Sequence, residues 1–178
     1  TYTTLEDDIY IQKTPLDKFL SFLGLLHTPD SDYLSTTFDG NGHTIYNLSR
    51  PICFSVEEDG AIKNIDINES TIEKAGICEI NEGTLENITV ESTVIPSEDG
   101  AGLVELNNGL IENCTFKGEI LREHVEASQQ IGGIARSNSG IINNCAVVQS
   151  TIKSCTDAGG VACTNTGKII DCYCSDLT

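Results

Sequence analysis

Residues 132–145 read GGIARSNSGIINNC, and this stretch decides the fold because similar copies recur along the chain. Each copy runs from small residues through a strand-like segment to Gly, then to Ile or Leu, then to Asn or Asp. A repeat of 20–30 residues is typical of a solenoid, because one unit cannot bury its apolar side alone and stacked units can. The other copies are ICFSVEEDGAIKNI (52–65), GICEINEGTLENI (76–88), GLVELNNGLIENC (102–114) and GVACTNTGKIIDC (160–172). The anchor glycines, which we expect to share one corner, are Gly60, Gly83, Gly109, Gly140 and Gly167.

The connections between the copies indicate which solenoid forms. The strand-like pieces are short and are separated by Gly, Asn and Ser, and the sequence between the copies shows no helical pattern. Each coil must therefore return to its start through turns alone. The sequence thus predicts an all-β chain whose residues 38–178 form a parallel β-helix of about six coils.

The first 37 residues do not fit the repeat and form a separate N-terminal segment. Thr14 is a good helix N-cap, Pro15 suits the first helical position, and Asp17 lies in the first turn. Apolar residues then recur at helical spacing over residues 15–26, namely Leu16, Phe19, Leu20, Leu23 and Leu26. We expect this amphipathic helix to cover the open apolar end of the first coil.

Composition excludes some classes of partner. The chain has 178 residues, which suits one domain, and 27 acidic against 10 basic side chains give a formal net charge of −17. Nucleic-acid binding needs clustered Lys and Arg, so this balance argues against it. The sequence also has no run of 18 apolar residues, and we expect no membrane insertion. No cofactor or metal is expected either, because the chain lacks the cysteine pairs and acidic motifs typical of zinc and calcium sites.

Alignment of the copies places one amide or carboxylate of each coil in a single column. Stacked side-chain amides about 4.8 Å apart can hydrogen-bond along such a column. We therefore expect a ladder that stabilises one turn of every coil and has no catalytic role. Its predicted members are Asn47, Asn64, Asn87, Asn113, Asn144 and Asp171.

The chain has eight cysteines, an even and high number, which favours an oxidising compartment and at least one disulfide. Cys114 and Cys145 belong to the column next to the ladder, so they are candidates for a bridge between adjacent coils. The alternative is that some thiols stay reduced and pack as small apolar side chains. The candidates are Cys53, Cys78, Cys114, Cys145, Cys155, Cys163, Cys172 and Cys174.

Four Asn-x-Ser/Thr sequons begin at Asn47, Asn68, Asn87 and Asn113. Three of these asparagines belong to the predicted ladder, where neighbouring coils would shield them from a bulky glycan. Asn68 is therefore the expected glycosylation site.

FDGNGHTIYNL (38–48), followed by coils of the form G-[IL]-x-x-x-N-x-G-x-[IL]-x-N-[CI], resembles the GLUG-type repeat region of large secreted or surface proteins. Such repeats occur in the non-catalytic part of immunoglobulin A metallopeptidases. The resemblance covers residues 38–174 and implies a right-handed parallel β-helix, located outside the cell, that acts as a stalk, adhesion or presentation module. The metallopeptidase chemistry does not carry over, because it needs HExxH and the three histidines, His27, His43 and His124, stand alone.

Three functions are compatible with these features. The first is a non-enzymatic extracellular scaffold with a protein or glycan partner, self-associating or continuing into further coils at its C-terminal end. The second is a carbohydrate-active enzyme or a polysaccharide-binding β-helix, which needs paired carboxylates or a suitable surface. The third is an ice- or cation-binding surface, suggested by the recurring pairs Ser70-Thr71, Ser92-Thr93 and Ser150-Thr151, although Glu119 interrupts the threonine row.

Overall fold

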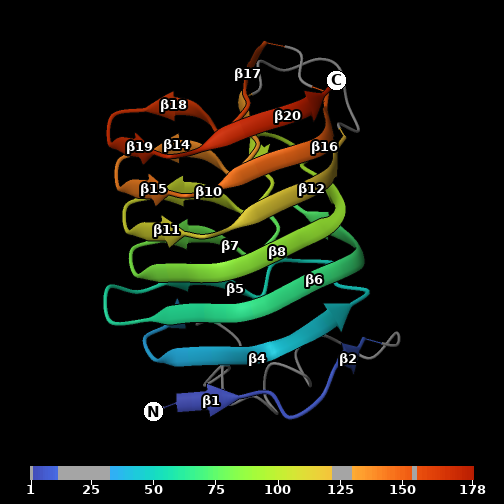
Figure 1. The fold of residues 1–178 in the computed structure, drawn as a ribbon, viewed down its shortest axis with the longest axis vertical. Coiled ribbons are helices and arrows are strands. Elements are labelled where there is room, and N and C mark those ends of the chain that lie inside the picture. Colours follow the sequence, from blue (N-terminus) through green and yellow to red (C-terminus); the bar gives the residue numbers. More distant parts are fainter. Residues whose placement is uncertain (1, 12–32, 122–129, 154–155) are drawn as a thin grey trace.

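The computed structural model describes residues 2–11, 33–121, 130–153 and 156–178. They form an all-β parallel β-solenoid of about five turns. Figure 1 shows the coils stacked along the longest axis, with the two ends of the chain at opposite ends of the stack. Every strand pair is parallel. The predicted parallel β-helix is thereby confirmed at the level of its architecture.

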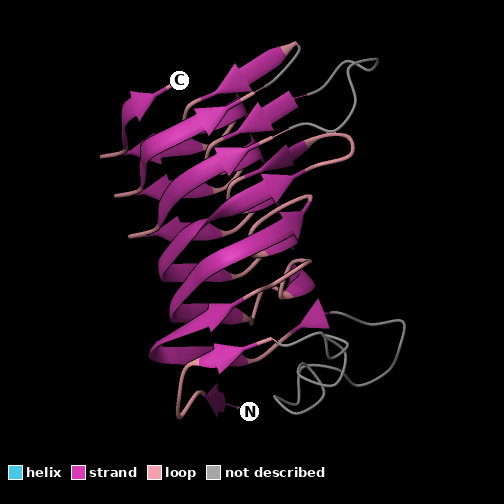
Figure 2. Ribbon diagram, turned by 90° about the vertical axis from the view of Figure 1, so that its right-hand side faces the viewer, coloured by secondary structure: helices cyan, strands magenta, loops and turns pink. Residues whose placement is uncertain are grey.

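In the described part of the chain the strands belong to three sheets, and the chain passes from one sheet to the next around each coil; the third sheet is confined to the later coils (Figure 2). The eleven-stranded sheet A contains β1 (Tyr2–Thr4), β2 (Ile9–Tyr10), β4 (Thr37–Tyr46), β6 (Ala61–Glu73), β8 (Thr84–Ile95), β11 (Leu110–Glu112), β12 (Thr115–Ile120), β15 (Ile141–Asn143), β16 (Ala146–Ile152), β19 (Lys168–Ile170) and β20 (Tyr173–Leu177). The six-stranded sheet B contains β3 (Tyr33–Leu34), β5 (Cys53–Val56), β7 (Cys78–Asn81), β10 (Val104–Asn107), β14 (Ala135–Asn138) and β18 (Ala162–Asn165). The three-stranded sheet C contains β9 (Gly100–Ala101), β13 (Gln130–Gly132) and β17 (Asp157–Gly159).

The core is a continuous apolar column inside the coils. Inward side chains of one coil lie in register with those of the next, as Ile62 does with Leu85 and Ile111 with Ile142. Among the residues that the structure describes, Phe38 and Phe116 are the fully buried phenylalanines, and both belong to sheet A. β-Branched side chains suit this pleated, stacked environment, which accounts for the high isoleucine content.

The five anchor glycines share one corner, between sheets B and A. The amide of Leu110 donates to the carbonyl oxygen of Gly83, and the amide of Ile141 donates to that of Gly109. A Cβ atom on Gly109 would collide with the carbonyl oxygen of Gly83, and the same holds for Gly140 over Gly109. Glycine is required at this corner because the backbones of successive coils approach too closely for a side chain.

Two features of the N-terminal region concern the sequence predictions. Residues 15–26, where a capping helix was expected, lie outside the described residues, and the part of the chain that the structure describes contains no helix. Strands β1 and β2 both pair with β4. The stack therefore begins before residue 38, the expected start of the solenoid.

Candidate functional site

An outer asparagine column follows one bend of sheet A. Asn64, Asn87, Asn113, Asn144 and Asp171 all have φ between 48° and 55°, the left-handed region that asparagine and aspartate tolerate best among side chains with a Cβ. Asn87 Nδ2 donates to Asn64 Oδ1 over 2.9 Å, and Asn144 Nδ2 donates to Asn113 Oδ1 over 2.7 Å. The column therefore stabilises a turn in successive coils.

Asn47 is not part of this column, and the prediction needs a correction there. The Nδ2 atom of Asn64 donates instead to Asp39 Oδ1 over 3.0 Å. Tyr46 pairs with Asn68, so Asn47 lies beside Glu69 at a second bend of sheet A. Sequence alignment missed this because β4 carries a register shift between Asp39 and His43.

An inner asparagine column, at the end of the sheet B strands, was not singled out from the sequence. Asn81, Asn107 and Asn138 are completely buried, and each Nδ2 donates to the Oδ1 of the next coil over 2.7–2.8 Å, ending at Asn165. The same amides also donate to backbone carbonyls, as Asn138 does to Lys168. The ladder begins at Asn81, whose Oδ1 is buried without a partner among the described residues because Val56 occupies the preceding position. The sequence signal for this column is the Asn-x-Gly that ends the sheet B strand in four of the five copies, at Asn81, Asn107, Asn138 and Asn165.

The cysteines stack as free thiols. Cys53 lies in register with Cys78, and the amides of Cys114 and Cys145 donate to the sulfur of the next cysteine, Cys145 and Cys172 respectively, each over 3.4 Å. Every cysteine in the described part of the chain is free, which corrects the expected disulfide; Cys155 lies outside it.

A geometric reason explains the missing bridges. In-register residues on parallel strands have nearly parallel Cα–Cβ bonds about 4.8 Å apart, whereas a disulfide needs a Cβ–Cβ distance of about 3.8 Å. Burial also raises the pKa of the Cys78 and Cys114 thiols. These cysteines therefore act as core side chains of low reactivity.

The sequon asparagines differ in exposure from the prediction. Asn68 is half-buried and its Oδ1 is fully covered, whereas Asn47, Asn87 and Asn113 are exposed. The difference arises because the ladder residues occupy an outward bend, while Asn68 is drawn in beside the buried Ser70, whose hydroxyl donates to its carbonyl oxygen over 2.9 Å. Asn68 is therefore a poor acceptor site for a glycan.

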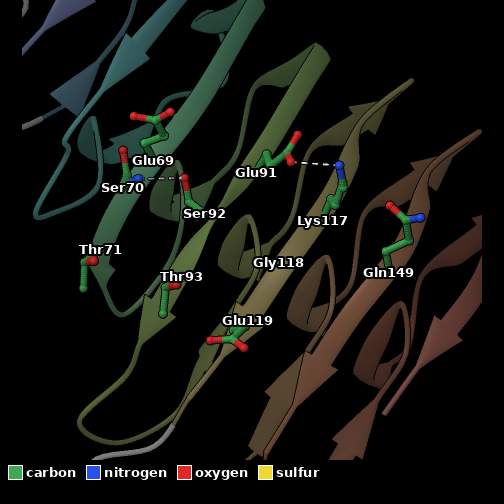
Figure 3. Close-up of a pocket in the computed structure, with 10 residues that line it drawn as sticks. All are labelled: Glu69, Ser70, Thr71, Glu91, Ser92, Thr93, Lys117, Gly118, Glu119 and Gln149. Atoms are coloured by element: carbon green, nitrogen blue, oxygen red, sulfur yellow. Dashed lines mark hydrogen bonds and ion pairs between the residues drawn. The ribbon is translucent and has the colours of Figure 1, made fainter.

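A polar groove of about 490 Å³ crosses the second bend of sheet A (Figure 3). Glu69 and Gln149 carry positive φ and each insert one extra residue into their coil, as the register shifts show. The two coils between them, which contain β8 and β12, lack this extra residue and form the floor. Gly118 belongs to the floor, where a Cβ would collide with the carbonyl oxygen of Ser92.

The side chains along this groove are mostly carboxylates and hydroxyls. Thr71, Thr93, Glu119 and Thr151 lie in one in-register row, and Lys117 Nζ pairs with Glu91 Oε1 over 2.8 Å. The serine hydroxyls form hydrogen bonds with the backbone: Ser92 Oγ accepts a hydrogen bond from the backbone amide of Ser70 over 3.3 Å. Within the described ranges no group of three or more His, Cys, Asp or Glu side chains is arranged to hold a metal ion.

A second row of charges runs along the outer face of sheet B. Glu79, Glu105 and Arg136 follow the in-register residues Cys78, Val104 and Ala135, so they are neighbours on adjacent strands. Arg136, whose side chain is only 17% exposed, pairs with Glu105 over 3.3 Å and with Asp99 over 3.5 Å. Lys74 pairs with Glu79 over 2.9 Å.

The pKa values in this row reflect its partial burial. Burial raises the pKa of Glu105, and this effect outweighs the attraction of the Arg136 guanidinium, which lowers it. The pKa of Lys74 is raised, chiefly by its hydrogen bond with Glu79. Alignment of the copies places Glu79, Glu105 and Arg136 at equivalent positions, but these three residues were not among the site residues predicted from the sequence.

A recess of about 160 Å³ lies beside the same row. Phe54 is an exposed aromatic at its edge, and Tyr33 meets the Phe54 ring edge-on with ring centroids 5.7 Å apart. The residues that line the recess are Arg50, Pro51, Cys53, Phe54, Glu73, Lys74 and Glu79.

Comparisons with known protein families, with curated proteins and with solved structures gave no match to this chain. Among the residues described, no helix is long and apolar enough to cross a membrane.

Proposed function

We propose that this chain is a non-enzymatic extracellular scaffold, a stalk or presentation module for adhesion. The observation that carries the proposal is the parallel stack of coils, in which two asparagine columns and an apolar core repeat similar contacts along the axis. Such a stack is quasi-one-dimensional, and its outer faces are free to display side chains to a partner. The GLUG-type resemblance of residues 38–174 adds the right-handed winding, which is the usual hand of parallel crossover connections.

The placement outside the cell rests on that resemblance. The described cysteines are free, so the cysteine count no longer favours an oxidising compartment. The N-terminal capping helix belongs to the same proposal, as the counterpart of the polar caps that terminate other solenoids.

Labelling of intact cells tests the location. An antibody raised against the purified chain should label unpermeabilised cells of the organism that makes it, or should find the chain in the medium. Labelling that appears only after permeabilisation would contradict the proposal. A cytoplasmic protein of the same cells serves as the control for membrane integrity.

A carbohydrate-active enzyme is the second candidate, because Glu79 and Glu105 lie on adjacent strands and the pKa of Glu105 is raised by burial. Glycoside hydrolysis uses two carboxyl groups, one of them an acid of raised pKa. The scaffold is favoured because Lys74 and Arg136 already neutralise these carboxylates. Release of reducing ends from polysaccharides by the wild type, lost in Glu105→Gln, would favour the enzyme instead.

A further inference from the structure

We propose that the recess beside Phe54 is a binding site for one neutral pyranose unit of a glycan, which rests on the proposed adhesion function and names its ligand class. The site is formed by β5 with the two residues Arg50 and Pro51 that precede it, by the end of β6 with Lys74, and by Glu79 on β7. It shares no lining residue with the groove of Figure 3. Its elements are an exposed aromatic ring, a concave surface of limited size and polar side chains of both charges.

The aromatic ring supplies the apolar part of the site. A pyranose has a face of C–H bonds and a rim of hydroxyls. An aromatic ring is a flat apolar surface on which the C–H face of the sugar can pack. Phe54 is 36% exposed although its strand neighbours, Cys53 and Ser55, are buried. The edge-on contact with Tyr33 holds the Phe54 ring in place, so less side-chain freedom is lost when a ligand binds.

The polar rim fits hydroxyl groups. Glu73 and Glu79 provide acceptors, and Lys74 provides a donor that is already oriented by its 2.9 Å contact with Glu79 Oε2. Arg50 adds a second cation at the rim. Charged partners give the stronger hydrogen bonds to neutral hydroxyls.

Charge balance indicates that the sugar is neutral. The rim contains two cations and two carboxylates, so its formal charge is zero on a chain whose formal net charge is −17. The overall negative field opposes an anionic sugar, and the balanced rim has no excess charge that requires a charged ligand of either sign.

Size restricts the site to one unit. A volume of about 160 Å³ corresponds to about five waters at roughly 30 Å³ each, which suits a single six-membered ring. Glu105 and Arg136 continue the row from Glu79 along the axis, one coil apart. Adjacent units of a glycan would therefore lie along sheet B and meet these two side chains.

The test is a titration of ¹⁵N-labelled protein with neutral tetrasaccharides of glucose, xylose and N-acetylglucosamine, and with tetragalacturonate as an acidic probe. At least one neutral probe should shift amide signals of residues 50–54 and 73–79. Phe54→Ala should weaken its binding at least tenfold, and Phe54→Trp should retain it. Tyr173→Ala is the matched control, because Tyr173 is 60% exposed and lies outside the recess. This variant should bind the neutral probe as tightly as the wild type does.

Three results would overturn the assignment. They are no shift with any neutral probe at millimolar concentration, tighter binding of tetragalacturonate than of every neutral probe, or unchanged affinity of a folded Phe54→Ala protein. A failure here is distinct from failure of the scaffold proposal, because cell-surface labelling does not depend on Phe54.

Discussion

At the scale of single residues, the two asparagine columns have different physical roles. The outer column occupies left-handed turns at the surface, where conformation matters more than the exposed hydrogen bonds. The inner column is buried, and the amides of Asn107 and Asn138 both donate to one neighbour and accept from the other. A buried amide without its partner loses its hydrogen bonds to water as well, so the inner column should contribute more to stability.

Replacement of Asn107 by Ala tests this difference. It removes the acceptor of Asn81 Nδ2 and the donor to Asn138 Oδ1, so we expect a loss of about 2–4 kcal/mol in the free energy of unfolding. Asn87→Gly keeps the left-handed turn and removes an exposed amide, and it should cost less than about 1 kcal/mol. Urea unfolding of both variants measures the difference, and equal losses would contradict the distinction.

Glu105 should make stability depend on pH in a specific direction. Its folded-state pKa is raised above the ordinary value of 4.5, so the folded state binds the proton more tightly than the unfolded chain does. The resulting stabilisation is present below pH 4.5 and is lost as the pH rises through the folded-state pKa. Glu105→Gln removes this dependence.

We therefore expect the stability of the wild type relative to Glu105→Gln to fall as the pH rises from about 4 towards neutrality. Urea unfolding of both proteins at a series of pH values measures this difference. A wild type that gained stability relative to the variant over the same range would show that the Arg136 ion pair, and not burial, dominates.

At the scale of the element, the coil is specified mainly by its corners. The repeat of Gly, an apolar residue and Asn predicted the parallel stack and the glycine corner, because these positions are dictated by close backbone approach. It did not predict the bend at Glu69 and Gln149, because single extra residues there change the register of neighbouring coils without changing the repeat. The same limitation misplaced Asn47.

The candidate sites were harder to predict from the sequence than the corners of the coils. The Glu79, Glu105 and Arg136 row has no common residue type, so it carries no repeat signal. The recess at Phe54 depends on how Arg50 and Lys74, distant from each other in sequence, come together across coils. Asn68 was misjudged because burial at a bend depends on the neighbouring coil, which a sequon does not encode.

Gly109→Ala tests the glycine corner. Its Cβ would collide with a backbone carbonyl that cannot move without displacing the Gly83 coil, and we expect a cost of at least about 1–3 kcal/mol. Gly42→Asn is the control, since Gly42 has a φ of 79° and open space around its Cβ position, and asparagine tolerates positive φ. The thermal midpoint should fall clearly only for Gly109→Ala; a similar fall in both would contradict the role of close approach.

At the scale of the whole molecule, a formal charge of −17 acts on a narrow stack. Like charges on successive coils repel one another, and salt screens this repulsion over about 10 Å at 0.1 M. We therefore expect the thermal midpoint to rise when sodium chloride increases from about 10 mM to about 300 mM. A midpoint that fell would indicate that the ion pairs of Arg136, Lys74 and Lys117 outweigh the repulsion.

A nuclear Overhauser experiment on protein labelled with ¹⁵N-asparagine tests the parallel stack of coils most directly. We expect cross-peaks between the side-chain amide protons of Asn81 and Asn107, and between those of Asn107 and Asn138, residues 26 and 31 positions apart in the sequence. Absence of both contacts, with cross-peaks that instead pair residues across antiparallel hairpins, would contradict it.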